Sequence, residues 1–447
     1  MISYNNDTIA AIATATGESG IAIVRMSGSL AIPIADSLFS GAVTSYLSHS
    51  VHLGQVFSTK KEVIDSCLLL VMKNPKSFTG EDVVEFQCHG GFFASKKILE
   101  ALIEKGARLA LPGEFSFRAF INGKIDLSQA EAIQHLISAK NEQAFQIAKN
   151  QFSGGLSKKI KEIQNSILKI AATIEALHDF PDEDLQINLS SKTINDLCLI
   201  IENIENLTSS YDEGRRLILG SEVSIIGSPN SGKSSLLNAL TNQERAIVSS
   251  IPGTTRDLIK EDFMLEGKLI KLVDTAGIRE TTDIIEKEGI KKAQHAINYS
   301  SLILYVIDST NPLYVPINLD LTKTIIVWNK QDLTSNKYFF PKAKYEVHIS
   351  TKTGEGLFQL KKLIKKLLDN LTKDKSDIFL VSERHYTILL KTLNFLKAAK
   401  QGLQLHIFPE IISIEIRSAI ETLGEILGTH VSEQILEQIF NTFCIGK

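Results

Sequence analysis

Several long segments of the chain repeat apolar residues every three or four positions, the spacing of an amphipathic helix. Between residues 195 and 207 the apolar stripe consists of Leu197, Ile200, Ile201, Ile204 and Leu207. The same spacing recurs in residues 126–149, 156–177, 381–405, 410–427 and 432–443. We therefore expect an all-α helical domain made of residues 119–215 and 376–447, with another domain inserted between its two parts.

The first part of the chain, residues 1–118, contains segments with the two-residue alternation or the short apolar runs of β-strands. Val83–Cys88 alternates apolar and polar residues in the manner of a half-buried strand. Other strand candidates are residues 8–14, 20–26, 51–57 and 65–71, and a helix is expected over 92–105. These patterns predict an α+β N-terminal domain without a phosphate-binding loop.

The inserted segment, residues 216–375, has continuous apolar strands at 302–308 and 324–328, as a buried parallel sheet requires. A hairpin is expected over 261–274, with its turn at Glu266–Gly267. Another strand, 221–226, leads into a glycine-rich turn and a helix. The segment therefore predicts an α/β domain with a doubly wound sheet.

The glycine-rich turn, G-S-P-N-S-G-K-S-S at residues 227–235, matches the P-loop pattern G-x-x-x-x-G-K-[ST]. Gly227 and Gly232 let the backbone turn, so that amide N–H groups and the helix N-terminus face phosphate oxygens. Lys233 would reach the outer phosphates, and the Ser234 hydroxyl would ligate Mg²⁺. A plain turn before an ordinary helix is disfavoured, because further nucleotide-binding sequences follow in order.

Four such sequences follow the P-loop. I-P-G-T-T-R-D at 251–257 stands where a switch loop would bring Thr255 to Mg²⁺. D-T-A-G at 274–277 supplies the Asp274 carboxylate near Mg²⁺ and the Gly277 N–H for the γ-phosphate. In N-K-Q-D at 329–332, Asp332 accepts two N–H bonds that guanine offers and adenine lacks, and S-T-K at 350–352 closes the base pocket. The inserted domain is therefore expected to be a Ras-like GTPase domain.

The residue after D-T-A-G is Ile278, where many such domains have a glutamine that orients the attacking water. Ile278 cannot hydrogen-bond water, so another group must do so. Nearby candidates, each of which can equally belong to a solvated charged face, are Arg256, Arg279, Glu280, Asp283 and Glu286. Asn230 in the P-loop, together with switch-loop carbonyls, could ligate a monovalent cation that replaces an arginine finger.

Three charged residues, Arg25, Glu85 and Lys124, interrupt apolar strands or loops in or just beyond the N-terminal domain. Surface charge, an internal ion pair and a binding role are all open at this point. Cys88-His89 is more typical of a core cysteine beside a turn histidine than of a metal site. The acidic turn at residues 179–184 is more typical of a solvated helix cap.

The chain has 447 residues, with 48 basic and 51 acidic side chains and a net charge of −3, so any nucleic-acid contact must be local or weak. Without a C-x-x-C pair, neither a disulfide framework nor a zinc site is indicated by the scattered cysteines Cys67, Cys88, Cys198 and Cys444. No apolar run approaches the ~18 residues of a transmembrane helix. The polar N-terminus lacks a signal-peptide pattern, so we expect a cytoplasmic protein without membrane attachment.

Further motifs flank the inserted domain: S-F-T-G-E-D-V-V-E at 77–85, P-G-E-F-S-F-R-A-F at 112–120, D-F-P-D-E at 179–183 and C-I-G-K at 444–447. Together with D-T-A-G-I-R-E and the other nucleotide sequences, they make the whole chain resemble the bacterial MnmE (TrmE) family of tRNA-modification GTPases. The nucleotide sequences alone are shared with ribosome-assembly GTPases. The flanking motifs therefore decide the resemblance.

The resemblance implies that the N-terminal domain binds 5-formyltetrahydrofolate, or a related tetrahydrofolate, as one-carbon donor through Arg25, Glu85, Lys124 and Lys447. Arg25 and Lys124 would pair with folate carboxylates, and Glu85 would bond the pterin edge. With MnmG (GidA), a partner that uses FAD and NADH, the family adds a carboxymethylaminomethyl or aminomethyl group at C5 of the wobble uridine of certain tRNAs. Cys444 matches a cysteine needed for modification; alternatively it is a buried small hydrophobe.

The resemblance also implies K⁺ ligation by Asn230, Ser249, Ile251 and Thr254, beside Mg²⁺ at Ser234 and Thr255. Glu286 would orient the hydrolytic water through a second water, and the implied catalytic residues are Glu286, Arg256 and Cys444. The implied nucleotide-binding residues are Asn230, Ser231, Gly232, Lys233, Ser234, Ser235, Ser249, Thr254, Thr255, Asp274, Thr275, Ala276, Gly277, Asn329, Lys330, Asp332, Ser350, Thr351 and Lys352.

The family forms homodimers through its N-terminal domains and joins MnmG in a heterotetramer or larger assembly. A different function, an RNA-binding ribosome-assembly switch, predicts a basic domain beside the GTPase, and the sequence shows none. The local basic cluster Lys158, Lys159 and Lys161 is more typical of a solvated helix face, although it could touch tRNA. A membrane-associated GTPase would need a basic amphipathic anchor or a lipidation motif, and neither is present.

Overall fold

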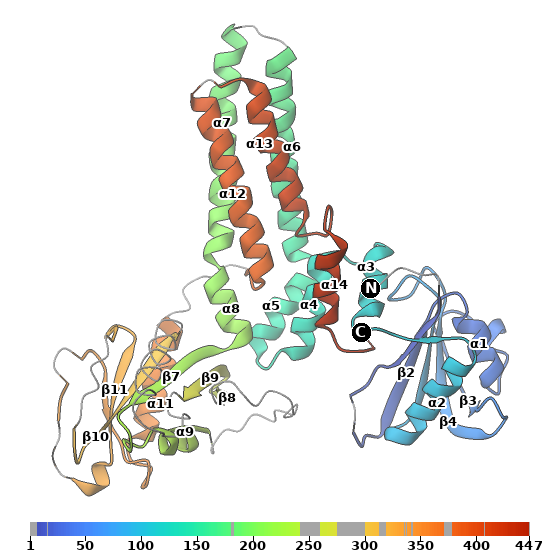
Figure 1. The fold of residues 1–447 in the computed structure, drawn as a ribbon, viewed down its shortest axis with the longest axis horizontal. Coiled ribbons are helices and arrows are strands. Elements are labelled where there is room, and N and C mark those ends of the chain that lie inside the picture. Colours follow the sequence, from blue (N-terminus) through green and yellow to red (C-terminus); the bar gives the residue numbers. More distant parts are fainter. Residues whose placement is uncertain are drawn as a thin grey trace, which may run out of the picture. The chain divides into compact units, whose positions relative to one another are not determined.

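The computed structural model describes residues 7–15, 17–179, 183–241, 260–274, 300–312, 319–334, 336, 338–340, 343–370, 378–405 and 407–446 (Figure 1). The chain divides into two compact units. The first contains Met1–Ile137, Asn150–Ile200 and Lys391–Lys447, and the second contains Ser138–Lys149 and Ile201–Leu390. Helices and two six-stranded sheets together confirm the expected multidomain class.

The sheet of the first unit has the strand order β3-β4-β5-β2-β1-β6. Neighbouring strands are antiparallel, except that β1 and β6 are parallel. The five strands expected from the sequence are present, whereas β6 has two residues and carries too little pattern to be predicted. The strands are β1 (Ile9–Ile12), β2 (Ile21–Ser27), β3 (Ser50–Phe57), β4 (Val63–Met72), β5 (Val83–His89) and β6 (Arg108–Leu109).

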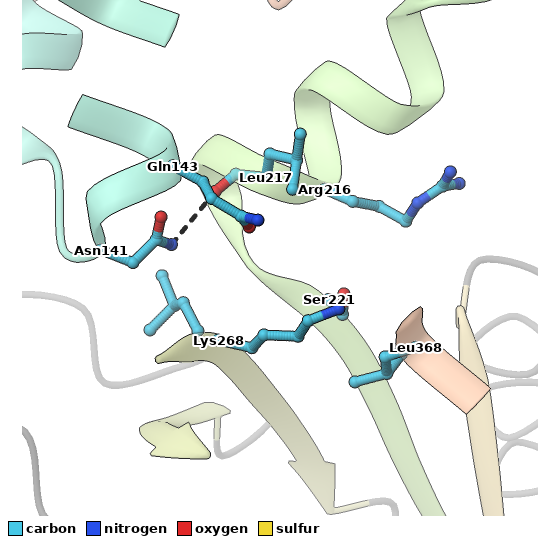
Figure 2. Close-up of a pocket in the computed structure, with 8 residues that line it drawn as sticks. Asn141, Gln143, Arg216, Leu217, Ser221, Lys268 and Leu368 are labelled. Atoms are coloured by element: carbon cyan, nitrogen blue, oxygen red, sulfur yellow. Dashed lines mark hydrogen bonds between the residues drawn. The ribbon is translucent and has the colours of Figure 1, made fainter. Parts of the chain in front are cut away.

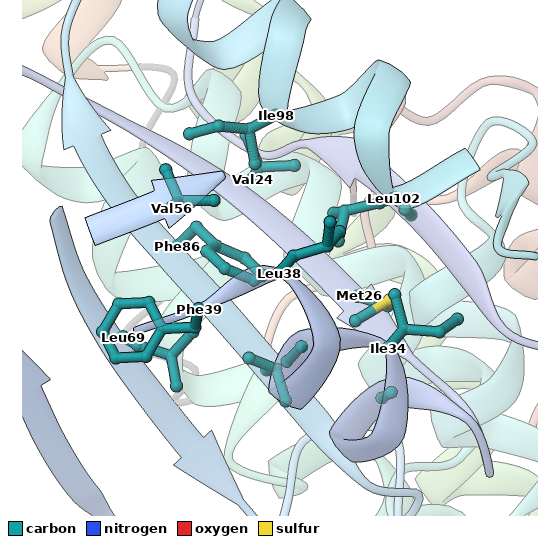
Figure 3. Packing of buried hydrophobic residues seen from close by; sticks show 14 of the residues in the cluster. Val24, Met26, Ile34, Leu38, Phe39, Val56, Leu69, Phe86, Ile98 and Leu102 are labelled. Atoms are coloured by element: carbon teal, nitrogen blue, oxygen red, sulfur yellow. The ribbon is translucent and has the colours of Figure 1, made fainter. Parts of the chain in front are cut away.

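One side of this sheet forms a core with two helices, α1 (Ala31–Leu38) and α2 (Phe92–Glu104), near the short 3₁₀ helix η1 (Val43–Ser45). Val24 and Phe86 from the strands meet Ile98 and Leu102 of α2 there (Figure 3). Because side chains alternate along a strand, Arg25 and Glu85 fall on the opposite side of the sheet.

That opposite side carries α3 (Glu114–Ile121), whose Phe115 packs against Ile9 and Ala11 of β1. From the sequence this segment stands out as a motif and not as a helix. Eight residues give too little periodicity for a helix to stand out.

The helical segments include α4 (Leu127–Ser138), α5 (Glu142–Phe152), α6 (Gly155–Asp179), α7 (Glu183–Ser209), α8 (Tyr211–Leu219), α12 (Glu383–Gln404), α13 (Pro409–Gly424) and α14 (Glu433–Asn441). In the first unit α6 and α13 lie along each other (Figure 1), and Gln164 Nε2 donates to the Ile420 carbonyl at 3.3 Å. The Phe117 ring of α3 meets the Phe440 ring of α14 edge-to-face, with centroids 5.4 Å apart. Helices from both sides of the inserted segment therefore share one core.

The single helix expected over residues 126–149 is wrong, because α4 ends at Ser138 and α5 begins at Glu142. Asn141 Oδ1 accepts the Ala144 N–H at 2.7 Å, and Asn141 Nδ2 donates to the Leu217 carbonyl at 3.2 Å. An asparagine that caps a helix competes with continuation of the preceding one. The apolar spacing continues across the break, so periodicity did not reveal it.

The sheet of the second unit has the order β12-β11-β10-β7-β9-β8, parallel except for the β8–β9 hairpin. Ile225 and Leu304 pack on one side with α9 and α11, while Tyr305 and Trp328 pack on the other. This arrangement confirms the predicted α/β class and the hairpin. The elements are β7 (Ser221–Gly227), α9 (Lys233–Thr241), β8 (Lys260–Leu265), β9 (Lys268–Asp274), β10 (Leu302–Asp308), β11 (Thr324–Asn329), η2 (Gln331–Leu333), β12 (Glu346–His348) and α11 (Leu357–Asn370).

Candidate functional site

The P-loop joins β7 to α9 along a path that requires glycine at two positions. A Cβ on Gly232 would lie 2.2 Å from Asn329 Nδ2, and the residue has a φ of +93°. A Cβ on Gly227 would lie 2.2 Å from the Val306 carbonyl oxygen. The glycines therefore allow the loop to press against the carboxyl ends of β10 and β11, where ligands of such sheets bind.

Lys233 begins α9 and points back over this loop. Its Nζ donates to the carbonyls of Gly227 at 3.0 Å and Ser228 at 2.7 Å. Ser231 Oγ is buried and has no hydrogen-bond partner among the described residues. A phosphate in the loop would meet the lysine ammonium and give this hydroxyl an acceptor, so the residues present fit a bound nucleotide. Ser234 and Ser235 follow in the first turn of α9 and are exposed.

Asn329 ties the P-loop to the loop that follows β12. Its Nδ2 donates to the Ser231 carbonyl at 3.0 Å, and its Oδ1 accepts the Thr351 N–H at 3.2 Å. Asp332 Oδ1 accepts the Ser350 hydroxyl at 2.7 Å. The structure thus brings the predicted N-K-Q-D and S-T-K residues together at the end of the sheet, beside the P-loop.

Asp308, at the end of β10, belongs to the same cluster although sequence reasoning did not name it. Lys330 Nζ lies 2.5 Å from Asp308 Oδ2. Burial raises the pKa of Asp308, but hydrogen bonds from Lys330 and Thr310 outweigh it and hold the pKa below its ordinary value. The sequence does carry a signal for this residue, because Asp308 is the polar end of the otherwise apolar strand β10. The ion pair fixes the Lys330 side chain beside the base pocket.

Many predicted residues lie outside the described part of the chain. Asp274 is described only as the last residue of β9, paired with Ile225 of β7. Residues 180–182 of the acidic turn are also outside. The remaining residues outside are Ser249, Ile251, Thr254, Thr255, Arg256, Thr275, Ala276, Gly277, Ile278, Arg279, Glu280, Asp283, Glu286 and Lys447.

A second candidate site lies in the first unit, where Arg25 of β2 faces Glu85 of β5. Arg25 Nε donates to Glu85 Oε1 at 2.6 Å, and the Glu85 side chain is 9% exposed. The guanidinium carbon of Arg25 lies 5.7 Å from the centre of the Phe115 ring, a cation–π distance. This is the internal ion pair that the sequence left open, and it is accessible enough to meet a ligand, since Arg25 is 21% exposed.

The C-terminal tail reaches this ion pair. Arg25 Nη1 donates to the Gly446 carbonyl at 3.3 Å, and the Gly113 N–H donates to the Cys444 carbonyl at 3.4 Å. Cys444 is exposed, so its interpretation as a buried small hydrophobe is wrong. Lys124 is also exposed, and among the described residues no hydrogen bond or ion pair joins it to Arg25 or Glu85.

A buried charge cluster lies next to the second site. Arg118 of α3 donates to Asp7, Glu81 and Glu114, and Glu81 Oε2 accepts the hydroxyl of Ser27 on β2 at 2.7 Å. Burial raises the pKa of Glu114, but hydrogen bonds from Arg108, the Leu111 N–H and Arg118 outweigh it and lower the pKa. Ser27 is two residues from Arg25 on the same face, so the cluster anchors the strand that carries Arg25.

Two of the other cysteines, Cys67 and Cys88, are buried and show no sign of reactivity. Burial raises the pKa of Cys67 to about 12 and that of Cys88 to about 11, so both thiols stay protonated. The described residues contain no cluster of His, Cys, Asp and Glu suited to a metal ion. His89 bonds Asp65 instead, with 2.8 Å between Nδ1 and Oδ1.

A small cavity in the second unit lies where α5, α8, β7, β9 and α11 meet (Figure 2). Its volume of about 20 Å³ admits about one water molecule, so it is a packing feature and not a substrate pocket. Within the described ranges, no helix combines the length and the apolar character needed to cross a membrane.

Comparisons with known proteins cover nearly the whole chain. A family profile described as "GTP-binding protein TrmE N-terminus" matches residues 8–124, and one described as "MnmE helical domain" matches residues 127–444. Proteins called tRNA modification GTPase MnmE are 51% identical in Chlamydia caviae, 52% in Chlamydia pneumoniae and 49% in a Chlamydia trachomatis strain. Each alignment covers 99% of both chains.

Among solved structures, the G domain of the T. maritima FeoB iron transporter is 30% identical and covers 33% of this chain and 98% of its own. Its TM-score of 0.26 is too low for the likeness to bear on function.

Proposed function

Because the chain belongs to the MnmE family of tRNA modification GTPases, we propose that it is the GTP-hydrolysing component of a complex that modifies the wobble uridine of certain tRNAs. The partner is a protein that uses FAD and NADH, of the MnmG type, and a tetrahydrofolate supplies one carbon. The product carries a carboxymethylaminomethyl or aminomethyl group at C5. The protein acts in the cytoplasm.

One observation carries this proposal: the end of the described chain, Cys444–Gly446, reaches the Arg25–Glu85 pair, with the Gly446 carbonyl 3.3 Å from Arg25 Nη1. A nucleotide switch alone has no need of this contact, which joins residues 421 positions apart. It supports a reaction site made from the two ends of the chain. Arg25 would then meet folate carboxylates, aided by Lys124 and Lys447, while Glu85 offers its second oxygen to pterin N–H groups.

Nucleotide chemistry is assigned to the second unit. GTP would lie on the P-loop with Lys233 at its outer phosphates, and Mg²⁺ would bind Ser234 and Thr255. K⁺ would bind Asn230, Ser249, Ile251 and Thr254 and supply positive charge beside the phosphates during hydrolysis. Glu286 would hold the attacking water, with Arg256 as a further catalytic residue. Support comes from the fit of Ser231 and Lys233 to a phosphate.

We further propose that two copies associate through the N-terminal sheet. β3 is an edge strand, and on the face shared with Glu85 it exposes Val51 and Leu53, beside Leu68 of β4. Leu53 is 76% exposed, which is unusual for leucine on a sheet face and typical of an interface.

The domain division proposed is 1–118 for folate binding and dimerisation, 119–215 with 376–447 for the helical domain, and 216–375 for the GTPase.

The direct test compares wobble uridines of tRNA, by mass spectrometry, from cells with and without this protein. We expect the substituted uridine to disappear in its absence and to return with the gene. An unchanged uridine profile would contradict the proposal. GTP hydrolysis is measured separately on the purified protein, so that the GTPase activity and the role in tRNA modification are tested independently.

A further inference from the structure

The last described residues of the chain follow a path that only glycine permits at one position. Gly446 is buried and has a φ of +91°, a region that L side chains rarely adopt. A Cβ on Gly446 would lie 2.6 Å from the Ile12 carbonyl oxygen and 3.0 Å from the Ala13 Cα. Both neighbours are backbone atoms at the end of β1, which cannot turn aside as a flexible side chain can.

Two hydrogen bonds to backbone carbonyls hold this part of the tail, Cys444–Gly446. The Gly113 N–H binds the Cys444 carbonyl, and Arg25 Nη1 binds the Gly446 carbonyl. Ile445 between them is 54% exposed, so its side chain adds little apolar anchoring. Phe443, which is 7% exposed, fixes the chain just before the tail. The position of Cys444 relative to Arg25 thus depends on the backbone path through Gly446.

We propose that Gly446 is a positioning residue, whose missing side chain lets the tail lie against β1 so that Arg25 can hold it and fix Cys444 beside the Arg25–Glu85 pair. The inference that Cys444 must be fixed there rests on the proposed function. The docking of the tail itself does not, and the two are tested by separate measurements.

The natural Cys444 makes the test possible with the full chain. Residues 1–443 carrying a C-terminal thioester are ligated to the peptide Cys-Ile-Gly-Lys, to Cys-Ile-Ala-Lys, or to the same peptide with D-alanine in place of alanine. The L-alanine methyl meets the β1 backbone and disfavours the positive φ. In D-alanine the methyl group takes the place of the other Hα of glycine, away from the β1 backbone, and the residue favours a positive φ. A fourth protein carries Gly106→Ala, where φ is +107° and, apart from the adjoining residues, no atom lies within 4 Å of the added methyl.

The readout is hydrogen exchange at the Gly113 amide, which the Cys444 carbonyl protects. With L-alanine at position 446 we expect exchange faster by roughly five- to thirtyfold, the factor that corresponds to the cost of a left-handed L-residue. The D-alanine protein and Gly106→Ala are expected to exchange like the natural chain, and all four should hydrolyse GTP alike. Unchanged exchange with L-alanine, or equally fast exchange with D-alanine, would overturn the proposal.

The proposed function is judged separately, by wobble-uridine modification in cells that express Gly446→Ala. A loss of modification accompanying fast Gly113 exchange is the expected result. Full modification despite fast exchange would leave the docking role of Gly446 intact, and would instead show that the tail is not part of the reaction site.

Discussion

Arg118→Met should destabilise the sheet of the first unit by about 3–5 kcal/mol, the usual cost of removing one partner from a buried ion pair. The Arg118 side chain is 2% exposed and bonds Asp7, Glu81 and Glu114 at 2.7–3.2 Å. Methionine replaces much of its aliphatic volume and none of its charge. The substitution therefore removes one guanidinium partner from each of these three carboxylates and makes no large cavity.

The loss of stability differs among the carboxylates that Arg118 contacts. Glu114 keeps Arg108, whose Nη2 lies 2.7 Å from Glu114 Oε1. Glu81 is 13% exposed and keeps only a hydroxyl partner, that of Ser27. Of the three carboxylates, it therefore loses the most stabilisation. The matched control is Arg108→Met: Arg108 is 39% exposed, and its partners keep Arg118, so about 1 kcal/mol or less is expected.

The assay is hydrogen exchange of β1 and β2 amides as a function of urea, which follows this sheet within the full chain. In the folded protein the pKa values of Asp7 and Glu114 lie below their ordinary 3.8 and 4.5. Their stabilising effect is therefore present above those values and is lost as the pH falls below them. Arg108 contributes more to this lowering than Arg118 does, so the difference between the natural chain and Arg118→Met should shrink in part between pH 7 and pH 3. A loss under 1 kcal/mol at pH 7, or one independent of pH, would show that Arg118 does not stabilise this sheet through its carboxylate partners.

Replacing K⁺ by Na⁺ should lower GTP turnover strongly, and equal rates in the two salts would remove Asn230 from the proposed cation site. Glu286→Ala should cripple hydrolysis and leave GTP affinity, measured by titration, nearly intact; lost affinity would instead indicate a structural role. Leu53→Glu should make the protein monomeric in sedimentation equilibrium, whereas Phe358→Glu, at a residue 72% exposed in α11, should not. A dimer that persists with Leu53→Glu would place the subunit interface elsewhere.

The fold followed from the sequence wherever apolar periodicity or a ligand-binding loop was long enough to register. The parallel strands β10 and β11 read as continuous apolar runs, and the hairpin turn carries Glu266 and Gly267 at positive φ. The break between α4 and α5 was missed because one capping asparagine decides it while the apolar spacing continues. α3 was missed because it spans eight residues.

For the sites, local motifs predicted the P-loop and base-pocket residues, which the structure brings together at the ends of β10, β11 and β12. Periodicity could not predict that Arg25 and Glu85 stand opposite each other, because this follows from the register of β2 against β5. The approach of the tail to Arg25 depends on packing between α3 and α14. The role of Phe115 under the Arg25 guanidinium had no sequence signal at all.

Wobble-uridine mass analysis in cells whose own gene carries either Lys233→Ala or Arg25→Met asks whether the GTPase domain and the two chain ends serve one reaction. If GTP hydrolysis and chemistry at the two chain ends serve one reaction, each substitution alone should remove the modified uridine. GTP hydrolysis by the purified proteins should be lost with Lys233→Ala and kept with Arg25→Met. Normal modification in the Arg25→Met cells would contradict the account.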